Sequence, residues 1–595
     1  MSAGFAVLVP PLPVPMAPAE EPSPPTDPPA EPPAEPKEAG PSQKRKLDDA
    51  EAPEAKSRRV REPAPDASRV MPMTTIICLH AAVAQKSYGN EKRFLCPPPV
   101  VHIEGPVWQM RSQHLGMSVV SETGERTFEQ KASLDSGMTS SFKFLHVTSA
   151  SSKAKSFLLS LDITEPPAQT AEDGPSGRVW ATFDSAPVTI ISKPSKKSAK
   201  TRNIASCILA GGPVSLFNRI NSQTVRTKYM MIDQTRLCAS NAAWSAFNVN
   251  VLKPAEDPED AAGTPPHAGA PTPVTYGSEI VLVDTHSGIT TTPLIIRKVD
   301  KNKVALEDTG PVSQMQKVAL QRVNTDGTRH YLSAAGPITG ISPSTGMASQ
   351  NGTHPLLFQG ARAIRERQDG RSVELDEIDD FLCWTIVGIS KFQYTFFDAF
   401  GQNNTIPEIP ITPFPTLFTA PVYRQEKNIV ELTVSNFFYE DPKSHQQVPL
   451  DVYLGNLGPL RHRVYQPGPP GVLTTVGFLP PATTANPPTA AEPPHILPPG
   501  SGGIHTIVMV EMPPIKDVLK ALEEDAIEPS SDAPAGPVGR SLPLLFIRAY
   551  DGVGYHSGRT ITCDNVFATI APDGTPDSSW LETSVASQGW TLRVM

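Results

Sequence analysis

Short apolar runs separated by turn residues make up most of the chain from about residue 74 onward. Residues 142–147, 156–162, 179–183 and 188–191 gather Val, Ile, Leu and Phe between Gly and Ser turns. Apolar residues that recur with a period of two, or in runs of four to eight, are typical of strands. Only residues 515–524 show a clear helical period. The pattern therefore predicts an almost entirely β protein.

Segments rich in proline, alanine and acidic residues divide this β pattern into units. The first 72 residues contain too few apolar side chains to offset the entropy of ordering, so we expect a disordered tail. Long Pro-rich or acidic stretches inside the later units predict surface inserts. We predict five successive parts: the tail (1–72), a first β domain (73–191), a second (192–390), a connecting strand or linker (391–408) and a third β domain (409–595).

The charge balance excludes a uniformly basic nucleic-acid coat, because the 595-residue chain has a net charge of −9. Between residues 184 and 236, however, nine Lys or Arg side chains accompany only two acidic ones. A basic surface on an otherwise acidic chain is a candidate binding footprint.

Other function classes lack a supporting pattern. The six cysteines are far apart and none forms a Cys-x-x-Cys pair, so we expect neither a disulfide framework, nor a metal, nor a cofactor. The chain contains no catalytic motif and no apolar run of the ~18 residues that span a bilayer, so we predict neither an enzyme nor a membrane protein. We interpret the acidic cluster at Asp376, Glu377, Asp379 and Asp380 as a solvated loop.

Two basic clusters in the tail lie nine residues apart. This spacing is typical of a bipartite nuclear-import signal, although a charged tail would show the same composition. We predict nuclear import through Lys44, Arg45, Lys46, Lys56, Arg58, Arg59 and Arg61.

The stretch from Gln85 to Phe94 places a Tyr, a Gly-Asn turn signal and a Lys-Arg pair between two apolar runs. A strand, a tight turn and a proline exit would form a basic fingertip, which can present Arg to guanine in a DNA groove. Charged turns also serve only to keep a surface solvated, so this stretch alone leaves both interpretations open.

Two further stretches carry polar groups suited to DNA. Residues 192–198 present three lysines and several hydroxyls around Pro194, as phosphate-binding segments do, and a solvated linker would look the same. In residues 216–226, Gln223 lies between Ser222 and Thr224 at the apex of a predicted hairpin. A short amide there could hydrogen-bond the minor groove, although polar tips are also ordinary turns.

Taken together, the three stretches resemble the CSL family, the suppressor-of-Hairless and recombination-signal-binding type of Notch-pathway transcription factor. The resemblance is carried by residues 84–99, 191–197 and 216–225, with further similarity at 293–300, 311–315 and 384–396. It implies an all-β multidomain fold: a Rel-homology-like N-terminal domain, a β-trefoil and a C-terminal Rel-like immunoglobulin (IPT) domain.

The resemblance also implies a function and its residues. A member would bind double-stranded DNA at GTGGGAA-like sites as a monomer and regulate RNA polymerase II genes with co-regulators that the sequence does not identify. Arg93 would contact guanine in the major groove, and Gln223 with Ser222 would contact the minor groove. The implied DNA-binding set is Gln85, Lys86, Ser87, Tyr88, Asn90, Glu91, Lys92, Arg93, Phe94, Ser192, Lys193, Ser195, Lys196, Lys197, Arg219, Ser222, Gln223, Thr224 and Arg226.

One departure concerns partners. The apolar trefoil groove that binds the Notch intracellular segment in animal members corresponds here to residues 267–275 and Thr290, which lack the apolar side chains. This argues against Notch binding, and the long inserts resemble the divergent fungal branch. An alternative without specific DNA binding is a β-rich nuclear scaffold for protein interactions.

Overall fold

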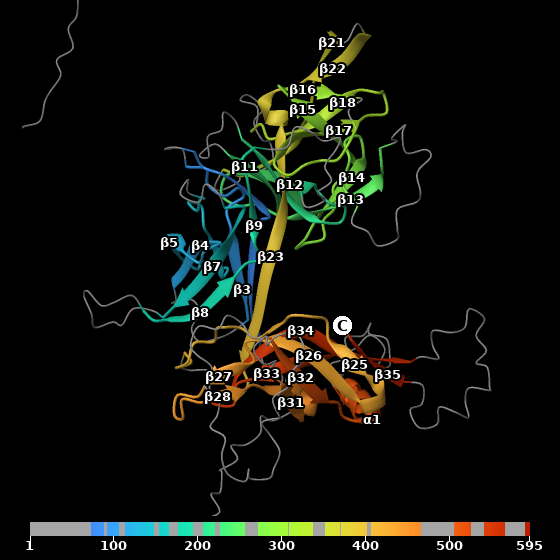
Figure 1. Cartoon of the computed structure of the whole chain (residues 1–595). Coiled ribbons are helices and arrows are strands. Elements are labelled where there is room, and N and C mark those ends of the chain that lie inside the picture. The colour runs from blue at the N-terminus through green and yellow to red at the C-terminus, as the bar shows by residue number, and fades with distance from the viewer. Residues whose placement is uncertain are drawn as a thin grey trace, which may run out of the picture. The chain divides into compact units, whose positions relative to one another are not determined.

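The computed structural model describes most of the chain beyond the N-terminal tail. The described residues are 73–88, 92–105, 114–147, 154–165, 177–193, 206–219, 227–255, 272–306, 309–336, 352–368, 371–401, 406–465, 505–524, 541–565 and 590–595. Strands dominate these residues, and the predicted all-β multidomain fold is confirmed (Figure 1). The predicted helix is also confirmed as α1 (Ile515–Glu524).

The N-terminal domain is built from two β layers. One sheet has the order β2-β9-β7-β4-β5, with β8 also pairing with β7, and the other layer places β3 between β1 and β6. Both layers contribute to one core that includes Ile76, Leu161 and Trp180. The strands are β1 (Met73–Ala81), β2 (Val83–Gln85), β3 (Val100–Glu104), β4 (His114–Ser121), β5 (Arg126–Ser133), β6 (Thr139–Ser141), β7 (Ser156–Thr164), β8 (Val179–Asp184) and β9 (Val188–Ile191).

The second domain, which the sequence predicts to be a β-trefoil and which is called the trefoil below, has its own core, with Leu216, Leu282, Leu320 and Trp384 among its members. Its 3-10 helix is η7 (Asp380–Leu382). Its strands are β10 (Pro213–Asn218), β11 (Lys228–Asp233), β12 (Arg236–Ser240), β13 (Phe247–Lys253), β14 (Glu279–Asp284), β15 (Leu294–Asp300), β16 (Lys303–Ala305), β17 (Gln316–Val323), β18 (Arg329–Ser333), β19 (His354–Pro355), β20 (Leu357–Gly360), β21 (Arg362–Gln368) and β22 (Arg371–Glu377).

The C-terminal domain contains two larger antiparallel sheets, a two-stranded sheet of β27 and β28, and α1. One sheet joins β24, β25, β26, β32 and β31, and β29, β30, β33, β34 and β35 pair in the other. Its elements are β24 (Thr416–Leu417), β25 (Val422–Arg424), η8 (Gln425–Lys427), β26 (Ile429–Ser435), β27 (Phe438–Glu440), β28 (Gln447–Pro449), β29 (Asp451–Leu454), η9 (Gly455–Leu457), β30 (Pro459–Leu460), β31 (His462–Tyr465), β32 (Thr506–Glu511), β33 (Leu542–Ile547), β34 (Val553–Asn565) and β35 (Trp590–Val594).

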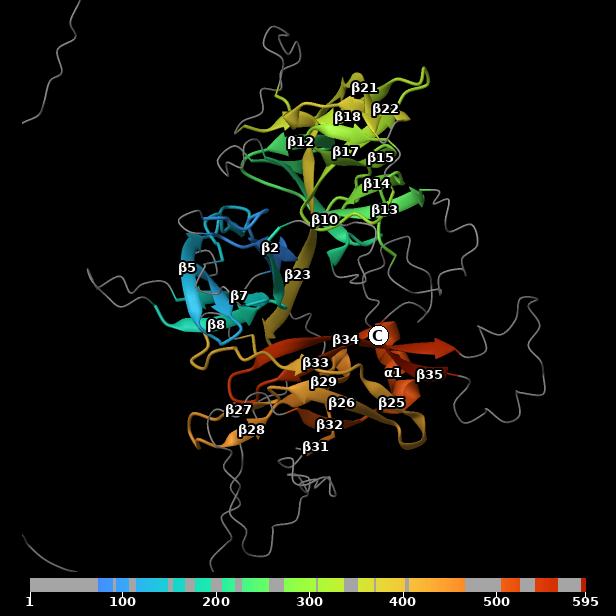
Figure 2. The same cartoon turned by 45° about the horizontal axis from the view of Figure 1, so that its top comes forward.

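One long strand, β23 (Trp384–Asp398), belongs to all three domains. Its first residues pair with β10 and β17 of the trefoil, and residues from Ile389 onward pair with β1 of the N-terminal domain. Its last three residues pair with β34 of the C-terminal domain. Figures 1 and 2 show β23 running between the three groups of strands. The strand begins before residue 391, where the sequence predicted the connection to begin.

The interpretation of the acidic cluster as a solvated loop is wrong for Asp376. This residue lies in β22 with only 2% of its surface exposed, and it accepts hydrogen bonds from Arg329 (2.8 Å) and the Tyr331 hydroxyl (2.5 Å). The fold supplies partners from β18, which is 45 or more residues away in sequence, so a local charge run could not reveal them.

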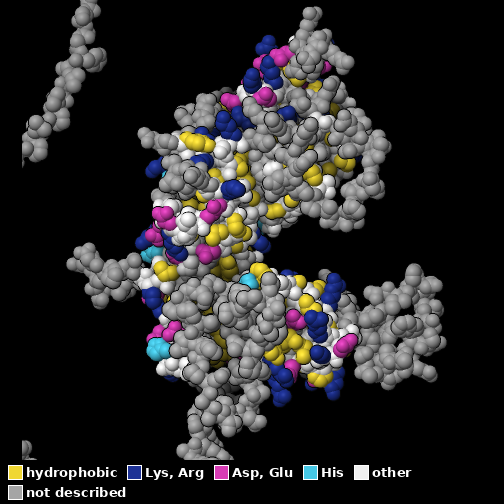
Figure 3. Space-filling model, in the orientation of Figure 1, with side chains coloured by type: hydrophobic (Ala, Val, Ile, Leu, Met, Phe, Trp, Pro, Cys, Tyr) yellow, Lys and Arg dark blue, Asp and Glu magenta, His cyan; other side chains and the backbone are white. Residues whose placement is uncertain are grey.

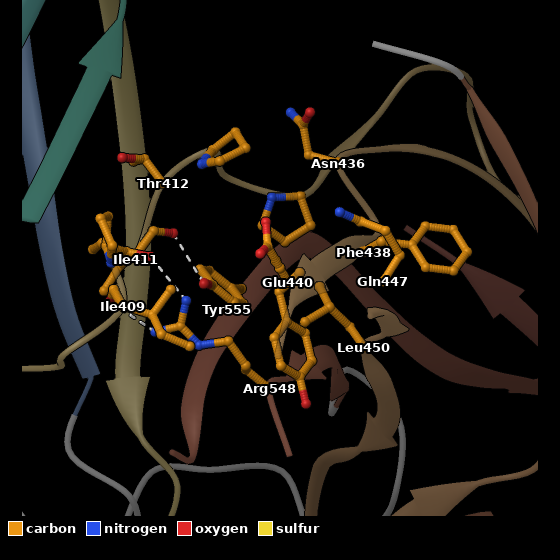
Figure 4. Close-up of a pocket in the computed structure, with 14 residues that line it drawn as sticks. Ile409, Ile411, Thr412, Asn436, Phe438, Glu440, Gln447, Leu450, Arg548 and Tyr555 are labelled. Carbon is orange, nitrogen blue, oxygen red and sulfur yellow. Dashed lines mark hydrogen bonds between the residues drawn. The ribbon is translucent and has the colours of Figure 1, made fainter. Parts of the chain in front are cut away.

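Buried Arg548 attaches the segment after β23 to the C-terminal domain. Its guanidinium donates to the carbonyls of Ile409 and Pro410 and is paired with Asp551 at 2.7 Å. The hydroxyl of Tyr555 donates to the Ile411 carbonyl at 2.9 Å. Figure 4 shows Arg548, Tyr555, Ile409 and Ile411 along one side of a pocket of about 300 Å³, with β27 and β28 residues on the other side. The pocket therefore lies at a structural joint.

We expect Arg548→Met to destabilise this joint strongly. The substitution leaves a carboxylate and two carbonyls without their buried partner, which costs about 3–5 kcal/mol. Hydrogen exchange of β33 and β34 amides should accelerate accordingly.

Arg424→Met is the matched control, because the ion pair of Arg424 with Glu431 is more than half exposed at the arginine. Exposed pairs contribute about 0–1 kcal/mol. Equal acceleration in both variants would contradict the role assigned to Arg548.

Candidate nucleic-acid interface

The first predicted DNA-binding stretch lies in the connection between β1 and β3, which pair antiparallel as the flanking apolar runs predicted. The connection is longer than a tight hairpin, because it includes β2, which pairs in parallel with β9 in the other sheet. The buried Ser87 hydroxyl accepts a hydrogen bond from the Arg93 backbone N–H at 3.0 Å. This bond closes the loop and holds the described residues on both sides of its tip.

An exposed aromatic ring organises the cations of this loop. The guanidinium of Arg93 lies 5.4 Å from the centroid of the Tyr88 ring, and the Lys86 ammonium lies 6.0 Å from it. Cation–π attraction at such distances contributes about 0.5–1 kcal/mol at an exposed site. Tyr88 is 45% exposed, and Lys86 and Arg93 are half-buried beside it.

Phe94 anchors the far side of the loop. It forms a β-bridge with His146, and its ring packs edge-on against those of Phe144 and His146 at 5.8 Å. Lys92, two residues earlier, is exposed. The loop thus combines an apolar anchor with exposed charge.

The lysine-rich junction begins beside this loop. Gln85 is in register with Ile191, whose carbonyl accepts the backbone N–H of Lys86 at 3.0 Å. Ser192 and Lys193 follow directly and are exposed. The parallel pairing of β2 and β9 therefore brings together two stretches separated by about 100 residues in sequence.

The third stretch is a hairpin, as predicted: β10 pairs antiparallel with β11 at Phe217–Tyr229 and Asn218–Lys228. The guanidinium of Arg219 donates to the Thr227 hydroxyl at 3.2 Å and to the Cys96 sulfur at 2.7 Å. Arg219 is thus engaged with both the hairpin base and the end of the first loop.

A small apolar cluster joins the N-terminal domain to the trefoil beneath these loops. It contains Val83 and Cys96 from the first domain, Phe217 and Tyr229 from the trefoil, and Ile389 from β23. Nearby, the Trp244 indole N–H donates to the Pro98 carbonyl at 2.9 Å. The two loop systems consequently share one packed base.

Sequence reasoning missed Cys96, Thr227 and Tyr229. Cys96 was considered only for disulfide or metal chemistry, and its sole local signal was its position two residues after the basic loop. The contact of its sulfur with the Tyr229 hydroxyl, at 3.2 Å, joins residues 133 apart. No spacing rule predicts a pair so distant in sequence.

Part of the predicted set lies outside the residues that the structure describes. This part comprises Asn90, Glu91, Ser195, Lys196, Lys197, Ser222, Gln223, Thr224 and Arg226, together with all seven residues of the import signal.

Figure 3 shows Lys and Arg side chains on the visible face in separate places, with acidic and apolar side chains between them. This agrees with the net charge of −9, since a coat of one sign would require a different balance. A basic binding footprint on the visible face would therefore be local.

Other chemistry is not indicated in the described part of the chain. No cluster of three or more His, Cys, Asp or Glu residues suited to a metal occurs there, and no described helix is long and apolar enough to cross a membrane. All six cysteines are buried as free thiols. Burial raises the pKa of the Cys383 thiol to about 11, so it stays protonated at neutral pH.

Comparison with known proteins identifies two of the domains. The family described as "LAG1, DNA binding" matches residues 76–205, and the "Beta-trefoil DNA-binding domain" matches residues 233–353. The first match contains the stretches at 85–94 and 192–198, whereas the hairpin stretch at 216–226 lies between the two matches.

Similar proteins carry related names. "Transcription factor cbf11" of Schizosaccharomyces pombe is 31% identical over 408 residues, which cover 66% of this chain and 62% of that protein. "Recombining binding protein suppressor of hairless-like protein" of Homo sapiens is 33% identical over 366 residues (58% and 62%), and that of Mus musculus is 33% identical over 368 residues (58% and 63%). The chain thus spans about three fifths of the length of these relatives.

We expect Ser87→Ala to loosen the first loop, because it removes the hydroxyl that accepts the Arg93 N–H. A lost neutral hydrogen bond of about 1 kcal/mol should accelerate exchange of the Arg93 amide about fivefold. Mass spectrometry of hydrogen exchange on a peptide covering residues 86–95 measures this change.

Ser140→Ala is the control, because the Ser140 hydroxyl is also buried but has no hydrogen-bond partner within the described structure. Its exchange profile in residues 86–95 should remain that of the unmodified chain. Unchanged exchange of the Arg93 amide in Ser87→Ala would contradict the loop-closing role assigned to Ser87.

Proposed function

The chain belongs to the CSL family, and from this premise we propose that it is a nuclear, sequence-specific transcription factor that binds double-stranded DNA. The observation that carries the proposal is the pair of DNA-binding domain matches over residues 76–205 and 233–353. The names of two relatives, a transcription factor and a suppressor-of-hairless-like binding protein, support the same proposal.

The proposed mechanism uses two grooves of one GTGGGAA-like site. Arg93 donates to guanine O6 and N7 in the major groove, and Tyr88 orients the guanidinium from its flank at 5.4 Å. Gln223 with Ser222 contacts acceptors in the minor groove. The lysines of the junction bind phosphates, which position the protein without reading sequence.

Several features support this division of roles. Arg is the residue best suited to bidentate contact with guanine, and Ser87 fixes its backbone at 3.0 Å. Lys193 is exposed two residues after Ile191, whose carbonyl accepts the Lys86 backbone N–H. Both loop systems rest on the shared apolar cluster, so a single protein could present both to one duplex.

The partners of the proposed factor are DNA and co-regulators, and the replaced residues at Thr290 and 267–275 argue against the Notch segment as one of them. A mobility-shift titration tests the function: a GTGGGAA duplex is compared with a scrambled duplex at about 0.15 M salt, near physiological ionic strength. Equal affinity for the two duplexes would favour the scaffold alternative.

We expect Arg93→Ala to weaken binding to the GTGGGAA duplex by about 1–3 kcal/mol and to relax selectivity at one base pair. The reason is the loss of a bidentate contact to one guanine. Titration against duplexes substituted at each position measures both effects. An equal loss on scrambled DNA would contradict base recognition by Arg93.

We expect Lys196→Ala to weaken binding to all duplexes similarly and to reduce the slope of log K against log salt by about 0.9, the contribution of one phosphate contact. Lys427→Ala, at an exposed lysine of the C-terminal domain, is the control and should leave the slope unchanged. A slope that does not respond to Lys196→Ala would exclude a phosphate contact there.

A further inference from the structure

The end of the first loop and the base of the trefoil hairpin meet in one polar cluster. Cys96 lies two residues after Phe94, and its sulfur is 3.2 Å from the Tyr229 hydroxyl in β11. The Arg219 guanidinium donates to the same sulfur at 2.7 Å. In sequence, Arg219 and Thr227 flank residues 220–226, which contain Gln223. The Arg219 guanidinium donates to the Thr227 hydroxyl at 3.2 Å.

Three members of this cluster, Cys96, Tyr229 and Thr227, are buried, and Arg219 is half-buried. Cys96 and Tyr229 are 3% and 6% exposed, and both belong to the apolar cluster between the two domains. Burial, reinforced by the neighbouring Cys96 thiol, raises the pKa of Tyr229, so the phenol remains a neutral hydroxyl. Buried polar groups that lose a partner carry a desolvation penalty, which favours keeping these contacts closed.

Arg219 is suited to join the two sides. Its planar guanidinium carries five donors in a fixed geometry, so it can donate in two directions at once. Here one direction leads to Thr227 of its own hairpin and the other to Cys96 of the other domain. The guanidinium also lies 5.3 Å from the centroid of the Phe217 ring, which restricts its orientation.

We propose that Cys96, Arg219 and Tyr229 form an interdomain latch that positions the major-groove loop and the minor-groove hairpin relative to each other, so that the two grooves are read as one site. The proposal rests on the proposed function. The latch residues are positioning residues, because they act through the loop that carries Arg93 and the hairpin that carries Gln223.

The latch has a distinct energetic signature. When two binding elements are held at a fixed separation, the second binds at a high effective concentration after the first, and loosening the connection lowers that concentration. Loss of the latch should therefore weaken binding only when both elements are able to bind. A substitution that removes a direct DNA contact would instead weaken binding equally in the unmodified chain and in the Arg93→Ala and Gln223→Ala variants.

The experiment is a set of double-mutant cycles in the full chain, read by titration of the GTGGGAA duplex. We expect Cys96→Ala to reduce affinity about tenfold in the otherwise unmodified chain, and less than about twofold when Arg93→Ala or Gln223→Ala is also present. Tyr229→Phe keeps the buried ring and removes only the hydroxyl, so it should show the same pattern with a smaller loss of affinity. It keeps the test valid if Cys96→Ala does not fold.

Two controls match these variants. Cys238→Ala removes a buried thiol of the trefoil outside the latch, and Tyr331→Phe removes a second buried, hydrogen-bonded hydroxyl of the trefoil. Neither should change affinity by more than about twofold.

Each alternative result overturns the latch. Equal losses in all backgrounds would mean a direct contact or general destabilisation. A loss that persists with Gln223→Ala but disappears with Arg93→Ala would mean that Cys96 supports only its own loop. An unmodified chain that does not prefer the GTGGGAA duplex would overturn the proposed function, whereas additive losses with that preference intact overturn the latch alone.

Discussion

The hydrogen bonding of strand β23 is the constraint on which the rest of the structure depends. An extended backbone of 15 residues presents N–H and C=O groups along both edges, and in a buried environment these must be paired. Residues 384–388 pair with β10 and β17 of the trefoil, residues 389–397 with β1 of the N-terminal domain, and residues 396–398 with β34 of the C-terminal domain. The register of one strand thereby fixes the connection of three domains.

Side chains along β23 reinforce this arrangement. Trp384 is buried in the trefoil core, and Phe396 packs with Phe183 and Trp180 in the N-terminal domain. Phe397 lies so close to Gly554 of β34 that a side chain at that glycine would collide with the ring. The strand is therefore held at both ends by backbone pairing and by buried side chains.

Polar groups hold the joints at which the chain passes from one domain to the next. Arg548 donates to two carbonyls of the segment after β23, and Arg219 joins the trefoil hairpin to Cys96. Both arginines donate in two directions from a planar group, which apolar packing cannot reproduce with the same directionality. The directional hydrogen bonds at these joints define how the joined segments are oriented, while the apolar clusters bury the surfaces between them.

The sequence determined the secondary-structure class, the helix at residues 515–524 and the three candidate DNA-binding stretches, because these depend on local period, turn residues and charge. The motifs at residues 84–99, 191–197 and 216–225 also carried the resemblance to the CSL family. The partners of Asp376, the span of β23 and the meeting of Cys96 with Arg219 and Tyr229 were decided only by the tertiary structure. Each joins residues far apart in sequence, and a local pattern contains no information about which distant surface will cover it.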